Sequence, residues 1–370
     1  MSTINAEERQ AIRDSFHRLL AETGREADVR RAMATDSGFD PVLWRAIADM
    51  GILGLLIPAD FGGIGAGAEE IELVMEEAGA ALLCGPLMSS GVLAASLLSY
   101  SSDEHAKARL LPAIGSGERI ATVAITGDRG LWTPTDVSVT AVRDGDGWRL
   151  DGVASFVTAG TQADTLLVIA KAGSGLATFE VDRGAAGVAV TALKSFDRGQ
   201  RFARIVFASA SGAPIEGANE AAIEKMLDLA RVALAGEQAG ATRHVFDMTV
   251  EYIKTRVQFG RPIGGFQAIK HMAADLLIEV ESATSAARHA ARALAEGMPD
   301  TEVLVSLAAF VCADAFSQIA ATSIQMHGGI GFTAEHPAHL YLRRARADAQ
   351  LFGNSSLYRE RYLSALEKAA

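Results

Sequence analysis

Three short segments of the chain combine residue types that could bind a ligand. The first is RVQFGRPIGGFQAIKH, residues 256–271. Arg256 offers a planar guanidinium fork that suits the oxygens of a diphosphate, and Gln267 offers an amide partner. The same mixture of Gly, Pro and aromatic residues is typical of a turn between two helices that binds nothing. On the residues alone, both interpretations remain open.

The second segment, IQMHGGIGFTAEHP, residues 324–337, is rich in glycine. Gly328, Gly329 and Gly331 would leave backbone N–H groups open to close approach by an anionic or planar ligand. Glycine after a helix is also an ordinary C-terminal cap, and His327 is better explained as a packed histidine than as a ligand. Here too the residues do not decide between a site and a turn.

The third segment, ASFVTAG, residues 154–160, lies among residues that favour strands. Phe156 could wall one side of a flat ring, and Thr158 could form a hydrogen bond to the edge of that ring. Taken alone, they are equally an ordinary aromatic and an ordinary β-branched residue of a strand.

The elements that would carry these segments fall into three regions. Residues 1–116 show the helical period in several pieces, and residues 117–214 contain short runs rich in Val, Ile, Thr and Phe. RDGDGW, residues 143–148, is a strong hairpin signal. From 215 to 370 the helical period returns in long segments. We therefore expect an α+β fold with an N-terminal α-helical domain, a central β-barrel or sandwich domain and a C-terminal four-helix bundle.

Composition limits the classes of function. The chain has 370 residues, a net charge of −11 and eight histidines without the spacing of metal ligands. The acidic balance argues against a nucleic-acid surface. Cys84 and Cys312 lie in apolar surroundings that predict buried thiols. The chain begins with a polar stretch instead of a signal peptide, and no apolar run approaches a membrane span. We expect a cytoplasmic protein that binds no metal, membrane or nucleic acid.

Two motifs together carry a resemblance. R-x-x-F-G-R-P-I-x-x-F-Q followed by Q-M-H-G-G-x-G-F, in an α–β–α order, resembles the acyl-CoA dehydrogenase family over essentially the whole chain. The resemblance implies an FAD-dependent enzyme, usually a tetramer with FAD between subunits. In the family reaction a carboxylate takes the α proton of an acyl-CoA thioester while the β hydrogen leaves as hydride to the flavin. Reduced flavin normally passes its electrons to an electron-transfer flavoprotein.

The resemblance assigns cofactor roles to individual residues. Arg256 would contact the FAD diphosphate, with Phe259 and Gln267 near the adenosine half. Thr158 would lie at the flavin N5 edge, and Phe156 replaces the usual tryptophan beside the ring. Gln325, Gly328 and Gly329 would contact FAD from the neighbouring subunit. Thr126 matches the threonine of the family's T-E-P motif, in which this chain has Gly127 in place of the acidic residue. The resemblance also assigns Ser355 to FAD.

The base that the reaction requires is missing from the pattern. In the family, Glu-Gly-Thr follows a helix like DAQLF and its Glu is the base; this chain has Gly353 there. A minority of the family carries the Glu on the helix before RVQFG, where this chain has Ala230. Asp228 and Arg231, which match residues that support the substrate site, are retained.

Two neighbouring carboxylates are candidates to substitute for the base. Glu237 shares the helix face of Ala230 but lies roughly 10 Å along the axis, and Glu360 has the same separation from Gly353. Both are too far away for direct proton abstraction without a different fold of the site. We expect both to be flanking or structural carboxylates.

One subgroup of the family matches a chain without a base. The acyl-CoA dehydrogenases of bacterial steroid side-chain degradation are α2β2 heterotetramers in which one subunit type keeps the base. The other completes the FAD site and makes room for a bulky substrate, and this chain resembles that second type. Its partners would be an acyl-CoA, a paralogous subunit and an electron-transfer flavoprotein. The alternatives are a homotetrameric dehydrogenase with a non-standard base and a non-catalytic binding protein on the same scaffold.

Overall fold

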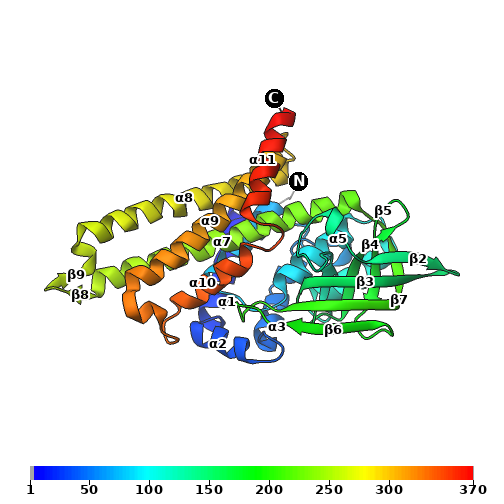
Figure 1. Ribbon diagram of the computed structural model, residues 1–370, viewed down its shortest axis with the longest axis horizontal. Coiled ribbons are helices and arrows are strands. Elements are labelled where there is room, and N and C mark those ends of the chain that lie inside the picture. The colour runs from blue at the N-terminus through cyan, green and yellow to red at the C-terminus, as the bar shows by residue number, and fades with distance from the viewer. Residues whose placement is uncertain (1–3, 370) are drawn as a thin grey trace.

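The computed structural model describes residues 4–369. Its N-terminal part is helical and packs beside a long helical bundle, with a β domain at the other side (Figure 1). A stretch of π-helix, Leu87–Ala94, leads into the fifth helix. The six helices of this part are α1 (Ala6–Thr23), α2 (Glu26–Ala34), α3 (Pro41–Asp49), α4 (Ala68–Ala80), α5 (Ala95–Tyr100) and α6 (Glu104–Gly115).

The central part is a mixed sheet that closes on itself. Strand β4 pairs with both β2 and β5, and the order β2–β3–β7–β5 completes the circle; β1 adds to β4 and β6 adds to β7. The expected hairpin at 143–148 joins β2 to β3, with Asp144 opposite Gly147. The strands are β1 (Ala121–Ala124), β2 (Thr140–Asp144), β3 (Gly147–Thr158), β4 (Thr165–Ala172), β5 (Gly175–Asp182), β6 (Val188–Leu193) and β7 (Phe202–Asn219).

The C-terminal part is the expected helical bundle, and it begins where β7 ends. The β strand continues to Asn219, beyond the domain boundary predicted at 214. A two-stranded hairpin, β8 (Val257–Gln258) and β9 (Arg261–Pro262), forms the far tip of the bundle (Figure 1). The helices are α7 (Glu220–Thr255), α8 (Gln267–Glu296), α9 (Thr301–His327), α10 (Ala338–Asp348) and α11 (Ser355–Ala369).

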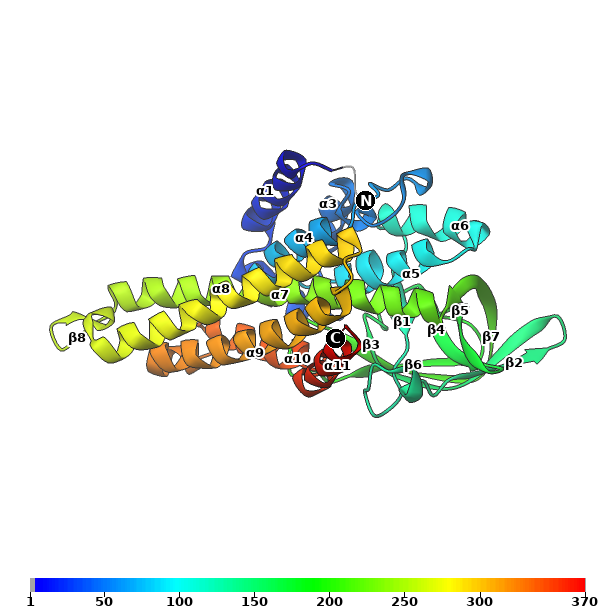
Figure 2. The same cartoon turned by 90° about the horizontal axis from the view of Figure 1, so that it is seen from above.

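Glycines let α4 and α7 touch through their backbones, which fixes the N-terminal part on the bundle. A Cβ on Gly79 would lie 1.9 Å from the carbonyl oxygen of Glu237, and one on Gly240 would lie 1.8 Å from that of Glu76. No side chain fits at such distances, so these positions require glycine. Figure 2 shows α4 lying between α1 and α7.

The buried interior includes both cysteines and most of α9. Cys84 and Cys312 are buried and free, as predicted. Among the described residues, one segment, Thr301–Phe332, is long and apolar enough to cross a membrane, which corrects the expectation that no run approaches that length. Because 61% of its most apolar window is buried inside the protein, it has the character of a core helix of the bundle.

Candidate active site

The turn between α10 and α11 forms around two residues with positive φ. Phe352 has φ +62° and Gly353 has φ +133°. A Cβ on Gly353 would lie 2.9 Å from the ring and the hydroxyl of Tyr358. That hydroxyl donates to the carbonyl of Phe352, and the side chain of Asn354 accepts from the N–H of Leu357 at 3.0 Å. The position predicted to lack the base is a glycine, and Tyr358 occupies the space that a side chain there would need.

Asp228 and Arg231, the predicted supporting pair, form an ion pair beside that turn. Nη1 of Arg231 donates to Asp228 at 2.6 Å, and Arg361 donates to the same carboxylate at 3.0 Å. The Arg231 guanidinium lies 5.9 Å from the centroid of the Tyr358 ring. Ala230, on the same helix, is fully buried in the apolar core.

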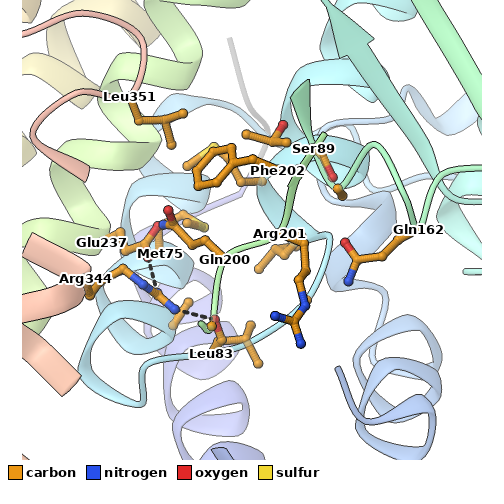
Figure 3. Close-up of a pocket in the computed structure, with 17 residues that line it drawn as sticks. Met75, Leu83, Ser89, Gln162, Gln200, Arg201, Phe202, Glu237, Arg344 and Leu351 are labelled. Carbon is orange, nitrogen blue, oxygen red and sulfur yellow. Dashed lines mark hydrogen bonds and ion pairs between the residues drawn. The ribbon is translucent and has the colours of Figure 1, made fainter. Parts of the chain in front are cut away.

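A cavity of about 60 Å³, the central cavity, lies where the three parts of the fold meet. Its walls are mostly apolar, and Figure 3 shows the labelled side chains converging on it from separate elements. The hydroxyl of Thr158, a residue that is 8% exposed, lines this cavity and has no hydrogen-bond partner among residues 4–369. The lining includes Met75, Leu83, Met88, Ser89, Thr158, Gln162, Gln200, Arg201, Phe202, Glu237, Arg344 and Leu351.

A buried ion cluster forms one side of the central cavity. Nε of Arg344 donates to Asp197 at 2.5 Å and Nη1 donates to Glu237 at 2.6 Å, while Gln200 donates to Asp348 at 2.7 Å. Burial raises the pKa of Glu237, and the Arg344 guanidinium opposes that shift. Glu237 is therefore held as the counter-ion of an arginine, whereas Glu360 is exposed on α11.

A second cavity of about 340 Å³, the flank cavity, lies between the β domain and α10. Phe156 forms one wall at an irregularity in the pairing of β3 with β7, where its φ is +55°. Trp132 and Phe202 are further walls, and Phe202 also lines the central cavity. Three cations, Arg129, Lys194 and Arg346, complete the lining. Aromatic walls with cations suit a flat, anionic ligand.

Thr126 and Ser355 use their hydroxyls within the protein. The hydroxyl of Thr126 donates to the carbonyl of Ser155, and the backbone carbonyl of Thr126 accepts the N–H of Ser155 at 2.8 Å, which fixes the strand that carries Phe156. Ser355 donates to Asp314 on α9 at 2.7 Å.

The other predicted cofactor residues lie at the far tip of the bundle. The ring of Tyr252 stacks on His327 at 4.4 Å and its hydroxyl donates to the carbonyl of His327 at 3.2 Å, which brings the α7–α8 hairpin beside the glycine-rich loop. Helix α7 has 36 residues, and Glu237, which lines the central cavity, precedes Arg256 by 19 positions, so roughly 28 Å of helix separates this tip from that cavity. The exposed predicted residues here are Arg256, Phe259, Gln267, Gln325, Gly328 and Gly329.

Sequence reasoning did not identify Tyr358, Trp132 or the Arg344 cluster. Trp132 is buried and meets Phe352 edge-on with ring centroids 4.8 Å apart. The only local signal was the four-residue spacing of Arg344 and Asp348, which places both on one face of a helix. Trp132 and Arg344 meet their partners from segments that are distant in the sequence, whereas Tyr358 lies only five positions after Gly353.

Comparison with known proteins gives consistent matches along the chain. Residues 6–118 match the acyl-CoA dehydrogenase N-terminal domain and residues 220–366 match the acyl-CoA dehydrogenase C-terminal domain. Acyl-CoA dehydrogenase IpdE2 of Mycobacterium tuberculosis is 33% identical over 347 residues, covering 93% of each chain. Acyl-CoA dehydrogenase FadE27 of the same organism is 34% identical over 333 residues, covering 86% of each.

Two solved structures are similar over nearly the full length. The ChsE4-ChsE5 complex from Mycobacterium tuberculosis superposes with a TM-score of 0.90 at 30% identity, covering 100% of this chain and 99% of the other. A variant of the Tcur3481-Tcur3483 steroid ACAD superposes with a TM-score of 0.89 at 29% identity, covering 98% of both chains.

Proposed function

This chain belongs to the acyl-CoA dehydrogenase family, and from that premise we propose that it is the base-lacking subunit of a heteromeric dehydrogenase. The complex would desaturate a bulky, steroid-derived acyl-CoA in the cytoplasm. The observation that carries the proposal is the state of position 353: a glycine with positive φ whose side-chain space is taken by Tyr358. A general base must come within hydrogen-bond reach of the proton that it removes, and neither Gly353 nor Ala230 can supply one.

Acyl-CoA dehydrogenases use FAD, which supplies the hydride acceptor when bound. The residues of this chain fit FAD in two separate halves. The unpartnered hydroxyl of Thr158 and the aromatic, cationic flank cavity suit a flat ring system. At the far tip, exposed Arg256 and Phe259 suit a diphosphate and an adenine. Because roughly 28 Å of α7 lies between Glu237 of the central cavity and Arg256, two different FAD molecules would use the two halves, which supports a cofactor shared between subunits.

The partner would be a paralogous, base-bearing subunit in an α2β2 assembly. Two similar structures carry paired names, ChsE4-ChsE5 and Tcur3481-Tcur3483, and the second is described as a steroid ACAD. The central cavity of this chain is small, about 60 Å³. This size favours placing the bulky acyl group in the site of the partner. An electron-transfer flavoprotein would then reoxidise the complex.

Co-expression with the paralogue tests the proposal. We expect a mixed tetramer that contains FAD, and anaerobic bleaching of its flavin by steroid-derived acyl-CoAs from a panel of thioesters. The chain expressed alone should not bleach flavin with any of them. A homotetramer of this chain with full dehydrogenase turnover would contradict the proposal.

A homo-oligomeric dehydrogenase that uses Glu237 is the second candidate. The observation in its favour is that Glu237 lines the same cavity as Thr158. Glu237→Gln should abolish flavin bleaching by the chain alone if Glu237 is the base. Under the main proposal it should leave the chemical step of the complex unchanged. Glu360→Gln, at an exposed position on α11, is the matched control.

A further inference from the structure

A small enclosed cavity lies beneath Gly353, between α7, α9 and the turn into α11. It has a volume of about 10 Å³ and shares Leu351 with the central cavity as a lining residue. A cavity of this size holds one water molecule when two or more polar groups can bond to it. The polar side chains that line it are Arg231, Gln238, Asp348 and Tyr358.

Two of these side chains are buried with an unpartnered atom. Nε of Arg231 and Oδ2 of Asp348 have no hydrogen-bond partner among residues 4–369, and the two residues are 4% and 1% exposed. Neighbouring atoms of both side chains are already bonded, since Nη1 of Arg231 donates to Asp228 and Oδ1 of Asp348 accepts from Gln200. A donor and an oxygen left unbonded in a protein interior are unfavourable, and a bridging water is the usual remedy.

We propose that one water molecule occupies this cavity and bridges Nε of Arg231 to Oδ2 of Asp348. It completes a hydrogen-bonded chain from Arg231 through water and Asp348 to Gln200, and so connects the vacated base position with the wall of the central cavity. The assignment does not depend on the proposed function, because it rests on the unpartnered atoms and the enclosed volume alone.

Charge favours water over an anion in this cavity. The guanidinium of Arg231 is already paired with Asp228 at 2.6 Å and lies 3.7 Å from Glu224. Burial raises the pKa of the Asp348 carboxyl group well above its ordinary value, and the nearby Glu237 carboxylate raises it further. Because two carboxylates already compensate Arg231 and a carboxyl group forms the other wall, an anion would be unfavourable, whereas water can accept from Nε of Arg231 and bond to Oδ2 of Asp348.

A high-resolution crystal structure of the full chain, with any partner that it purifies with, tests the inference. We expect one spherical peak about 2.7–3.2 Å from both Nε of Arg231 and Oδ2 of Asp348. An empty cavity, or a direct bond between the two side chains, would overturn the proposal. Crystals grown in bromide distinguish the alternative ligand, because an anomalous peak in the cavity would assign it to a halide.

Two lysine variants separate the role of Arg231 from a general effect of the ion cluster. Arg231→Lys removes the Nε–H donor, and we expect the peak to disappear. Arg361→Lys changes an arginine that bonds to the same Asp228 but does not line the cavity, so the peak should remain. A peak that persists in Arg231→Lys would refute the bridge, and the wild-type map alone decides the matter if that variant does not fold.

Discussion

Restoring the missing carboxylate by Gly353→Glu should destabilise the protein instead of creating a base. A residue other than glycine at φ +133° costs about 1–3 kcal/mol in backbone strain. Its Cβ would stand 2.9 Å from the ring of Tyr358 and from Cδ2 of Leu357, and overpacking of this kind costs about 1–3 kcal/mol more. We therefore expect the free energy of unfolding to fall by about 2–6 kcal/mol.

Urea unfolding and anaerobic flavin bleaching together measure this outcome. The unfolding midpoint should fall, and the rate of bleaching by acyl-CoA should not rise, because the new carboxylate is displaced by Tyr358. Gly353→Ala is the control, since it carries the same Cβ and the same φ strain without a carboxylate. If Gly353→Glu unfolds at the wild-type midpoint and gains turnover, then the space at position 353 is open and the steric argument is wrong.

Three further perturbations follow from buried contacts. Arg344→Met leaves two buried carboxylates unpaired, and the free energy of unfolding should fall by about 3–5 kcal/mol in urea titrations; an unchanged midpoint would show that the cluster is hydrated. Gly240→Ala places a Cβ 1.8 Å from a backbone oxygen of α4 and should cost at least about 1–3 kcal/mol, whereas Gly175→Ala, with open space around it, should cost little. Asp348 has a raised pKa in the folded state, so its contribution to stability is present below the unfolded pKa of about 4 and is lost as pH rises toward the folded pKa. Asp348→Asn should flatten that decline above about pH 4 in urea unfolding, and an equal slope in both proteins would contradict the raised pKa.

The sequence by itself determined the order of the three parts, and it predicts that the chain has no base at Gly353 or Ala230. Helical and strand periods are local patterns, and the hairpin at 143–148 depends on adjacent turn residues. Both features can therefore be predicted from short stretches of sequence. The prediction for Gly353 and Ala230 is equally local, because the neighbouring family motifs are enough to assign these two positions.

Only the tertiary structure decided what fills the space at position 353 and where the predicted cofactor residues lie. Tyr358 reaches Gly353 because two residues with positive φ reverse the chain, and no periodicity encodes that reversal. Arg344 is buried because Asp197 and Glu237 come to it from the β domain and α7. About half of α7 separates Arg256 from Glu237 in the wall of the central cavity. Contacts between distant segments depend on how whole elements pack, and the sequence pattern of one element does not specify which other elements it packs against.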